Sequence, residues 1–170
     1  MNLFDVLGDD VVIHADMLAI PQFEKVWKTF EDKNDALRIL KYVILNNHPL
    51  SNYVETYITK DRVALLKKEL LENLEYDEKL LEETEKKFIE EILDSLKIKL
   101  LRKLRGLLES AIEDIDAGKL GLEDAIDIGP KVDKLIRSIL VLEKDVKLEL
   151  SSKSSIKGGY KLGLLEKRRL

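Results

Sequence analysis

The chain has 170 residues, no cysteine and a formal net charge of −4 at pH 7. The lack of cysteine excludes a disulfide framework, a thiolate metal site and a cysteine nucleophile. Charged residues make up 36% of the chain and aromatic residues 6%, a balance typical of helices with one solvated face and not of a large β-sheet core. No apolar run reaches the roughly 20 residues of a membrane-spanning helix, so we expect no membrane contact.

Residues 1–20 are predicted to form an extended N-terminal arm. Val11, Val12 and Ile13 form a short apolar run after the turn-like residues Gly8 and Asp9, so the arm could include a short strand. Acidic residues stand where a secretory signal peptide would be basic and then apolar.

A small helical subdomain is predicted over residues 21–58. Pro21 suits the first turn of a helix, and Asn34 or Asp35 is placed to cap a second helix that ends at the segment 46–49. Residues 50–58 are expected to be a loop. Trp27 lies beside apolar neighbours on the first helix, where it belongs to a local core or, as a second interpretation, to a patch that faces a partner.

Residues 59–152 carry long amphipathic periodicity, which predicts a helical hairpin. Thr59 is a suitable N-cap for a helix over 60–73, and Asp77 for a second helix that continues to Ala117. Gly129 is expected to break the chain, with Pro130 opening the last helix. The two longest helices should fold back antiparallel. We therefore predict an all-α fold: a long antiparallel helical hairpin, a small N-terminal helical subdomain, and extended arms at both ends.

The C-terminal arm, residues 153–170, has a different composition. It contains six Lys or Arg residues against one acidic residue, and three glycines that disfavour a continuous helix. Its apolar residues are too many for a solvated linker. This mixture predicts a segment that docks into a groove or adds a strand to the sheet edge of a partner.

The sequence shows no arrangement typical of catalysis or metal binding. Neither His14 nor His48 stands in the Glu-x-x-His pattern of a di-metal bundle. The acidic group at Glu90, Glu91 and Asp94 has lysines three and four residues away, which is typical of a solvated helix face. No phosphate-binding loop or nucleophile elbow is present. We expect a protein that is not an enzyme and has no cofactor and no metal.

Two basic segments are candidates for contacts with phosphates. The run from Lys97 to Arg105 is interrupted by leucines at helical spacing, so it is first of all the solvated side of an amphipathic helix. The C-terminal arm is the better candidate, but it contains a single aromatic residue, Tyr160, and so lacks a base-stacking surface. Any contact with DNA would be directed to the backbone and sensitive to salt.

The two ends of the chain resemble a known group of proteins. The segments that carry the resemblance are 13–27, 36–53 and 158–167, which read IHADMLAIPQFEKVW, ALRILKYVILNNHPLSNY and GGYKLGLLEK. They are similar to those of small structural proteins of large tailed bacteriophages. The resemblance implies a virion component of the head-to-tail connector or neck, made in the bacterial host cytoplasm and present in several copies. Its partners would be portal, connector or tail subunits and copies of itself in a ring.

We expect the two arms to be the contact segments of this protein. The front anchor would be Val12, Ile13, Met17 and Leu18, joined by Trp27, and the rear anchor would be Tyr160, Leu162, Leu164 and Leu165. Two alternatives remain open from the sequence. One is a cytoplasmic helical adaptor or regulator that binds a partner through its helices, and the other is a nucleic-acid accessory protein that uses the basic arm.

Overall fold

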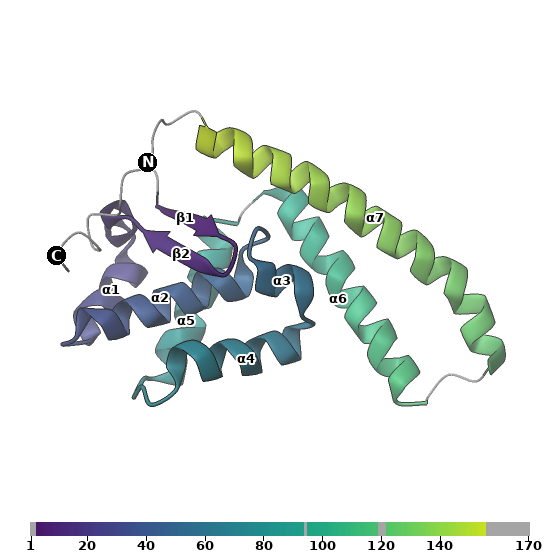
Figure 1. Ribbon diagram of the computed structural model, residues 1–170, viewed down its shortest axis with the longest axis horizontal. Coiled ribbons are helices and arrows are strands. Elements are labelled where there is room, and N and C mark those ends of the chain that lie inside the picture. Colours follow the sequence, from purple (N-terminus) through teal and green to yellow (C-terminus); the bar gives the residue numbers. More distant parts are fainter. Residues whose placement is uncertain (1–2, 94, 119–121, 156–170) are drawn as a thin grey trace. The chain divides into compact units, whose positions relative to one another are not determined.

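The computed structural model describes residues 3–93, 95–118 and 122–155; for 122–126 and 150–155 it describes the helix path and not the side chains. The chain is mostly helical, at 76%. It divides into two compact units, unit 1 up to Leu93 and unit 2 comprising Asp94–Lys153. Figure 1 shows the elements of both units.

The chain begins with a β-hairpin, so the expectation of an all-α fold is wrong in this segment. Strands β1 (Phe4–Leu7) and β2 (Asp10–Ile13) pair antiparallel, with Phe4 opposite Ile13. Gly8 opens the turn with φ +70°, a conformation that glycine adopts without steric cost. Val11 and Ile13 are buried against α2. Because alternate side chains of β2 face the core, this segment packs as part of the core and does not form the predicted extended arm.

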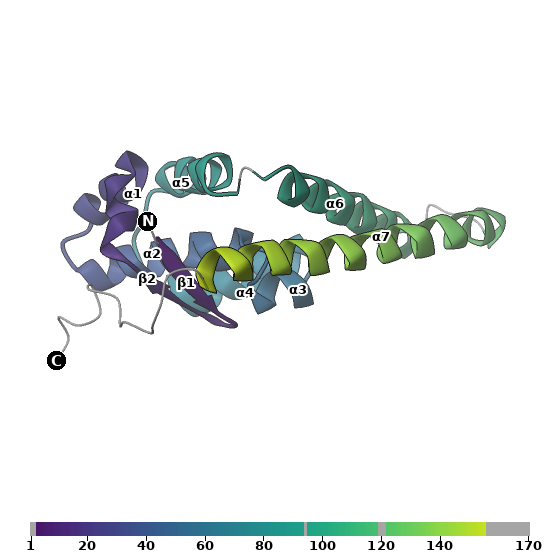
Figure 2. The same ribbon diagram turned by 90° about the horizontal axis from the view of Figure 1, so that it is seen from above.

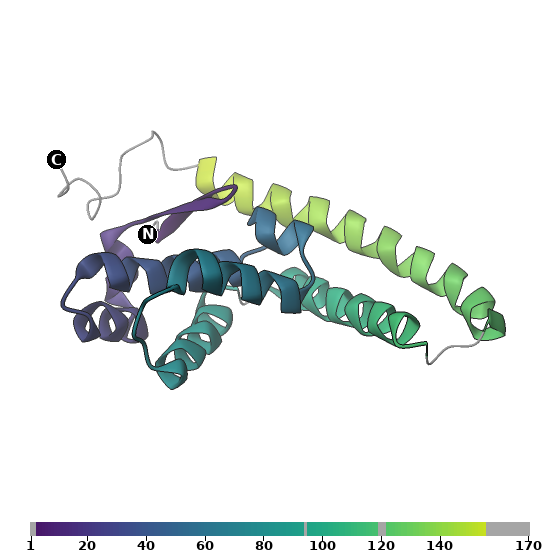
Figure 3. The same ribbon diagram turned by 60° about the horizontal axis from the view of Figure 1, so that its bottom comes forward.

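Unit 1 is built around one buried helix. A short 3₁₀ helix, η1 (Ala15–Ala19), leads into α1 (Pro21–Thr29), which begins at the predicted proline. Helix α2 (Lys33–Asn47) follows, with Asp32 as its N-cap in place of the predicted Asn34 or Asp35. Strand β2 and helices α1, α4 and α5 all pack on α2, and Figure 3 shows α4 running along it. This packing explains why nine α2 residues are buried.

The rest of unit 1 is helical. Residues expected to be a loop contain α3 (Asn52–Thr56), and α4 (Thr59–Leu71) follows the predicted range closely. Helix α5 (Glu78–Glu91) begins after Asp77, whose carboxylate accepts the Lys79 N–H at 2.9 Å as predicted for an N-cap. Phe88 of α5 is fully buried, with Phe23 and Phe4 as ring neighbours.

The single helix predicted from Asp77 to Ala117 is wrong, because the chain leaves the helical conformation between α5 and α6 (Leu96–Asp116). Ser95 is extended, with φ −62° and ψ 134°, and serves as the N-cap of α6. Asp and Ser side chains compete with the helical backbone for hydrogen bonds and favour helix ends. The apolar periodicity that continues across this point does not reveal the break.

Unit 2 is a hairpin of α6 and α7 (Leu122–Ser155), which Figures 1 and 2 show as two antiparallel helices. Helix α7 runs through Gly129 and contains Pro130 in its interior. The predicted break at Gly129 and helix start at Pro130 are therefore wrong. The loss of one backbone hydrogen bond at proline is tolerated in a helix of 34 residues. In the part of the chain that the structure describes, no helix is both long and apolar enough to cross a membrane.

Candidate protein-interaction surfaces

Helices α6 and α7 expose most of the large apolar side chains that reach solvent. Of eleven such side chains among the described residues, nine lie in these two helices: Leu96, Leu100, Leu107, Ile112, Ile115, Ile136, Leu140, Val141 and Leu148. Single exposed leucines are ordinary on protein surfaces. Nine on one hairpin mean that much of the apolar surface of α6 and α7 is uncovered, which is typical of an interaction site.

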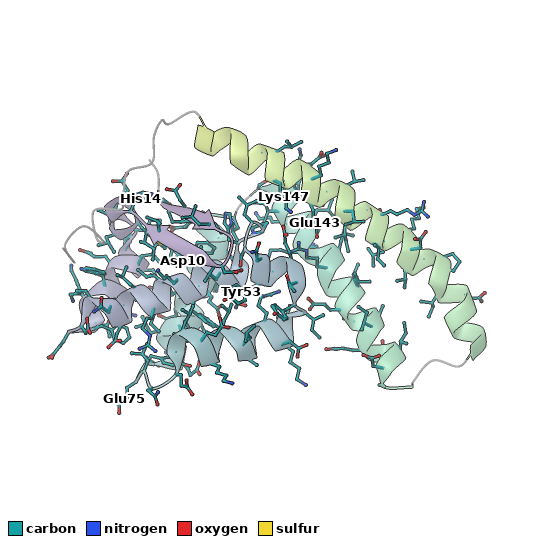
Figure 4. All side chains as sticks on the ribbon, in the orientation of Figure 1. Asp10, His14, Tyr53, Glu75, Glu143 and Lys147 are labelled. Atoms are coloured by element: carbon teal, nitrogen blue, oxygen red, sulfur yellow. The ribbon has the colours of Figure 1, made fainter. Side chains whose placement is uncertain are left out.

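The hairpin of α6 and α7 contains four buried apolar residues and ion pairs that join the two helices. Ile98 and Leu101 on α6 and Ile139 and Val146 on α7 are at most 5% exposed. The Arg105 guanidinium donates two hydrogen bonds to one Glu143 oxygen, at 3.1 and 2.7 Å. Figure 4 shows Glu143 on the side of α7 that is turned toward α6. These contacts fix the pairing of the two helices within the chain.

The charges of α6 run in the order that its helix dipole disfavours. Every charged residue from Leu96 to Arg105 is basic, and every one from Gly106 to Asp116 is acidic. A helix is stabilised by acidic side chains near its N-terminus and basic ones near its C-terminus, and α6 has neither in its end turns. A compensating gain must therefore come from contacts that α6 makes with other groups.

The predicted front anchor is divided by the fold. Ile13 and Met17 are 1% and 0% exposed and belong to the core of unit 1, which removes them from any anchor that binds a second chain. Val12 and Leu18 are half-buried. Both remain candidates for the front contact. Val12 lies on β2 between the buried Val11 and Ile13, so its side chain points to the other face of the hairpin.

Trp27 lies at intermediate burial on α1, and the Lys33 ammonium stands 5.6 Å from its ring centroid. The Lys33 ammonium also donates to the Trp27 carbonyl at 2.9 Å. A cation over the ring already occupies part of this surface. The predicted rear anchor, Tyr160, Leu162, Leu164 and Leu165, lies outside the described residues.

A surface groove in unit 1 was not predicted from the sequence. It encloses about 400 Å³ between the β1–β2 turn, α3 and α4, and its lining residues are Asp9, Asn52, Tyr53, Thr56, Tyr57, Leu65 and Glu69. The Tyr53 hydroxyl donates to Glu69 at 2.6 Å, which raises the pKa of Tyr53. Two tyrosine rings beside two carboxylates suit a cationic side chain. Figure 4 labels Tyr53 in this region.

The spacing of four residues between lining residues of the groove could have indicated part of it from the sequence. Leu65 and Glu69 are four residues apart and share a face of α4. Tyr53 lies in α3 and Tyr57 is its C-cap, with the two ring centroids 6.3 Å apart. Asp9 comes from a different part of the chain. Its place in the groove depends on the hydrogen bond from the Asn52 N–H to the Gly8 carbonyl, at 3.3 Å.

The buried polar residues Asn46, His48 and Ser51 of unit 1 do not form a catalytic arrangement. Asn46 receives a hydrogen bond from Arg62 at 3.0 Å and donates to Glu85 at 2.7 Å. His48 is 5% exposed, its Nδ1 accepts the Leu50 N–H, and burial lowers its pKa to about 4. It does not contact a nucleophile: the Ser51 hydroxyl is fully buried and has no hydrogen-bond partner among the described residues. These groups are out of reach of a substrate.

No group of His, Cys, Asp and Glu side chains with the spacing of a metal site occurs within residues 3–93, 95–118 and 127–149. Comparisons of the chain with protein-family models, with curated proteins and with solved structures found no match.

Proposed function

We propose that this chain is a non-enzymatic structural protein that acts by assembling in several copies, as a component of the head-to-tail connector or neck of a tailed bacteriophage. The nine exposed apolar side chains of α6 and α7 carry the assembly part of this proposal, because a chain that worked alone would bury more of this surface. The resemblance of the segments 13–27, 36–53 and 158–167 motivates the place in the virion. Copies of the chain and portal, connector or tail subunits would be its partners.

Charge segregation along the sequence supports a role for the C-terminal arm. Residues 1–93 contain 12 basic and 20 acidic residues, whereas residues 153–170 contain six basic and one acidic. Unit 1 is therefore strongly negative and the arm strongly positive. In our proposal the arm of one copy binds unit 1 of its neighbour, with a basic side chain in the groove beside Glu69, and repetition of this head-to-tail contact closes a ring.

The first test compares the native mass of the full-length chain with that of a chain ending at Ser152, by multi-angle light scattering. A discrete oligomer that dissociates on truncation is the expected result. If both chains are monomers, the chain does not assemble by itself, and the helical adaptor becomes the better hypothesis. Equal oligomers would show that the arm is not needed.

The second test separates the apolar and the charged contacts of the arm. Leu164→Asp with Leu165→Asp should prevent assembly by placing charge in the rear anchor, and Glu69→Lys with Asp9→Lys should do so by repelling the basic arm. Glu72→Lys with Glu75→Lys, which makes the same charge change at exposed positions outside the groove, is the matched control. Normal assembly of both double variants would refute the proposed arm contact.

The place in the virion has its own test. In particles that contain this chain, gold-labelled antibodies against unit 1 should mark the junction of head and tail. Labelling along the tail or over the capsid faces would contradict the neck assignment while leaving the assembly proposal intact.

A further inference from the structure

We propose that the C-terminal arm of one copy adds a third strand to the β-hairpin of its neighbour, with residues 160–164 pairing along β1. This inference rests on the proposed function, because it says how the arm would bind unit 1 of the next copy. The observation that carries it is the unpaired outer edge of β1, the edge that faces away from β2.

The outer edge of β1 presents backbone groups that are free to pair. The His14 N–H donates to the Leu3 carbonyl at 2.9 Å, which sets the alternation of the antiparallel ladder. By this alternation the N–H and C=O groups of Phe4 and Val6 point away from β2. Among the residues that the structure describes, none of these four groups has a backbone hydrogen-bond partner. Such an edge is a template for one more strand.

The side chains along this edge leave apolar surface open. Phe4 and Val6 lie opposite two buried residues of β2 and therefore point to the core face of the hairpin. Both are only half-buried, although Val11 and Ile13 on the same face are at most 1% exposed. Strand β2 packs on α2, and β1 packs on β2 as the outer strand (Figure 1). A third strand beside β1 would cover this apolar surface.

The arm contains a segment whose pattern matches that of β1. Residues 160–164 read YKLGL, so Tyr160, Leu162 and Leu164 stand at every second position. In an extended strand these three side chains lie on one face. Paired with β1, they would continue the apolar face of the hairpin. Main-chain hydrogen bonds would supply affinity, and the alternate apolar side chains would supply specificity.

The net charges favour the arm as the occupant of this edge. Residues 1–93 contain 20 acidic and 12 basic residues, whereas the arm contains one acidic and six basic residues. The arm and unit 1 therefore attract each other. Pairing β1 with β1 of a second copy would instead bring two negatively charged units together, and like charges across an interface oppose binding.

Antiparallel pairing would also connect this edge with the groove of unit 1. Strand β1 ends at the turn that contributes Asp9 to the groove. In an antiparallel third strand, Tyr160 lies at the end nearest this turn. Lys157 then lies about 10 Å beyond Tyr160, since a strand rises about 3.3 Å per residue. Lys157 becomes the basic side chain that the groove would receive.

The first measurement places proline at two neighbouring positions of the arm in the full-length chain. In the proposed strand the Leu162 N–H points to β1 and the Gly163 N–H points away from it. Leu162→Pro should therefore weaken association roughly tenfold or more. Gly163→Pro is the matched control and should associate normally, because proline is tolerated where its nitrogen faces away from the ladder. Leu162→Ala keeps the N–H and measures the effect of the side chain alone.

Hydrogen exchange at β1 reports on the added strand directly. In a chain ending at Ser152, the amides of Phe4 and Val6 should exchange quickly. In the assembled full-length chain the same two amides should exchange at least roughly tenfold more slowly, because they gain partners. The amides of Asp5 and Leu7, which face β2, are internal controls and should change less. Mass spectrometry with electron-transfer fragmentation resolves the individual amides.

The outcomes separate this inference from the proposed function. Protection of Phe4 and Val6 that is lost in Leu162→Pro and kept in Gly163→Pro would establish the strand contact. Equal exchange of these amides in the full-length oligomer and the truncated chain would overturn it. If that oligomer still dissociates on truncation, the proposed function stands and the arm binds in another way. Protection in a monomeric full-length chain would show pairing of the arm with its own β1, which refutes the contact between copies.

Discussion

Individual buried polar residues in unit 1 differ in how well their hydrogen bonds are satisfied. Asn46 bridges Arg62 and Glu85, with distances of 3.0 and 2.7 Å, so its amide is paired on both sides. The hydroxyl of Ser51 is equally buried and has no partner in the part of the chain that the structure describes. A buried polar atom without a partner loses its hydrogen bonds to water and gains none in return.

Ser51→Ala should therefore raise the free energy of unfolding by about 1 kcal/mol, because it removes an unsatisfied hydroxyl. Asn46→Ala should lower it by about 2 kcal/mol, because Arg62 and Glu85 each lose one hydrogen bond. Urea unfolding followed by circular dichroism measures both values. A loss of stability in Ser51→Ala would mean that the hydroxyl is bonded after all.

His48 gives the stability of unit 1 a dependence on pH. Burial lowers the pKa of His48 from 6.5 to about 4, so the unfolded chain binds a proton between these values while the folded chain does not. Stability is complete above pH 6.5 and falls as pH decreases toward 4, by up to about 3 kcal/mol. Comparing urea midpoints at pH 7.5 and 4.5 measures the loss.

His48→Gln is the comparison variant for this measurement, because its amide side chain is uncharged and cannot titrate. In this variant the difference in stability between pH 7.5 and pH 4.5 should be smaller than in the unmodified chain, whatever its absolute stability. His14, the other histidine, has its Nε2 2.7 Å from the Asp5 carboxylate and is less buried; Figure 4 labels it at the β-hairpin. An undiminished difference in His48→Gln would assign the pH dependence to other groups.

At the scale of elements, two glycines at α6 illustrate opposite requirements. Gly106 lies inside the helix, and an added Cβ would meet no heavy atom within 4 Å. Gly118 follows the C-cap with φ +62°, where an L side chain is strained. The first glycine weakens the helix for no gain in packing within the chain, and the second ends it.

Gly106→Ala should raise the free energy of unfolding by up to about 1 kcal/mol, and Gly118→Ala should lower it by a similar amount. Differential scanning calorimetry of the two variants gives both changes. If Gly106→Ala leaves unfolding unchanged but weakens association between copies, the glycine is kept for a close approach of another helix.

At the scale of the whole molecule, the uneven distribution of charge predicts how assembly responds to salt. The basic arm and the acidic residues 1–93 attract each other through screened electrostatics, and the screening length falls from about 10 Å at 0.1 M salt to about 3 Å at 1 M. Oligomers of the full-length chain should therefore dissociate as salt increases. Sedimentation velocity over this range measures the effect, with the chain ending at Ser152 as control.

If the truncated chain shows the same salt response as the full-length chain, the response belongs to charges outside the arm. An oligomer that grows with salt would indicate an apolar contact and would contradict an electrostatic role for the arm.

The sequence by itself determined the helices whose signals are local. Pro21 begins α1 and Asp77 caps α5, because the fixed φ of proline and the carboxylate of an N-cap act within one turn. Gly118 follows α6 with a positive φ, which glycine adopts without strain, and this signal is also local. The composition likewise predicted a mostly helical chain.

Where local signals compete with contacts between distant parts of the chain, only the tertiary structure decided the conformation. The β-hairpin packs on α2, so that residues expected in a free arm became core. The break at Ser95 and the continuity of α7 through Pro130 could not be predicted from the sequence either. Apolar periodicity is the same on either side of a helix break or a proline. Which apolar face stays uncovered depends on the packing of α6 against α7, and periodicity alone cannot tell a buried stripe from an exposed one.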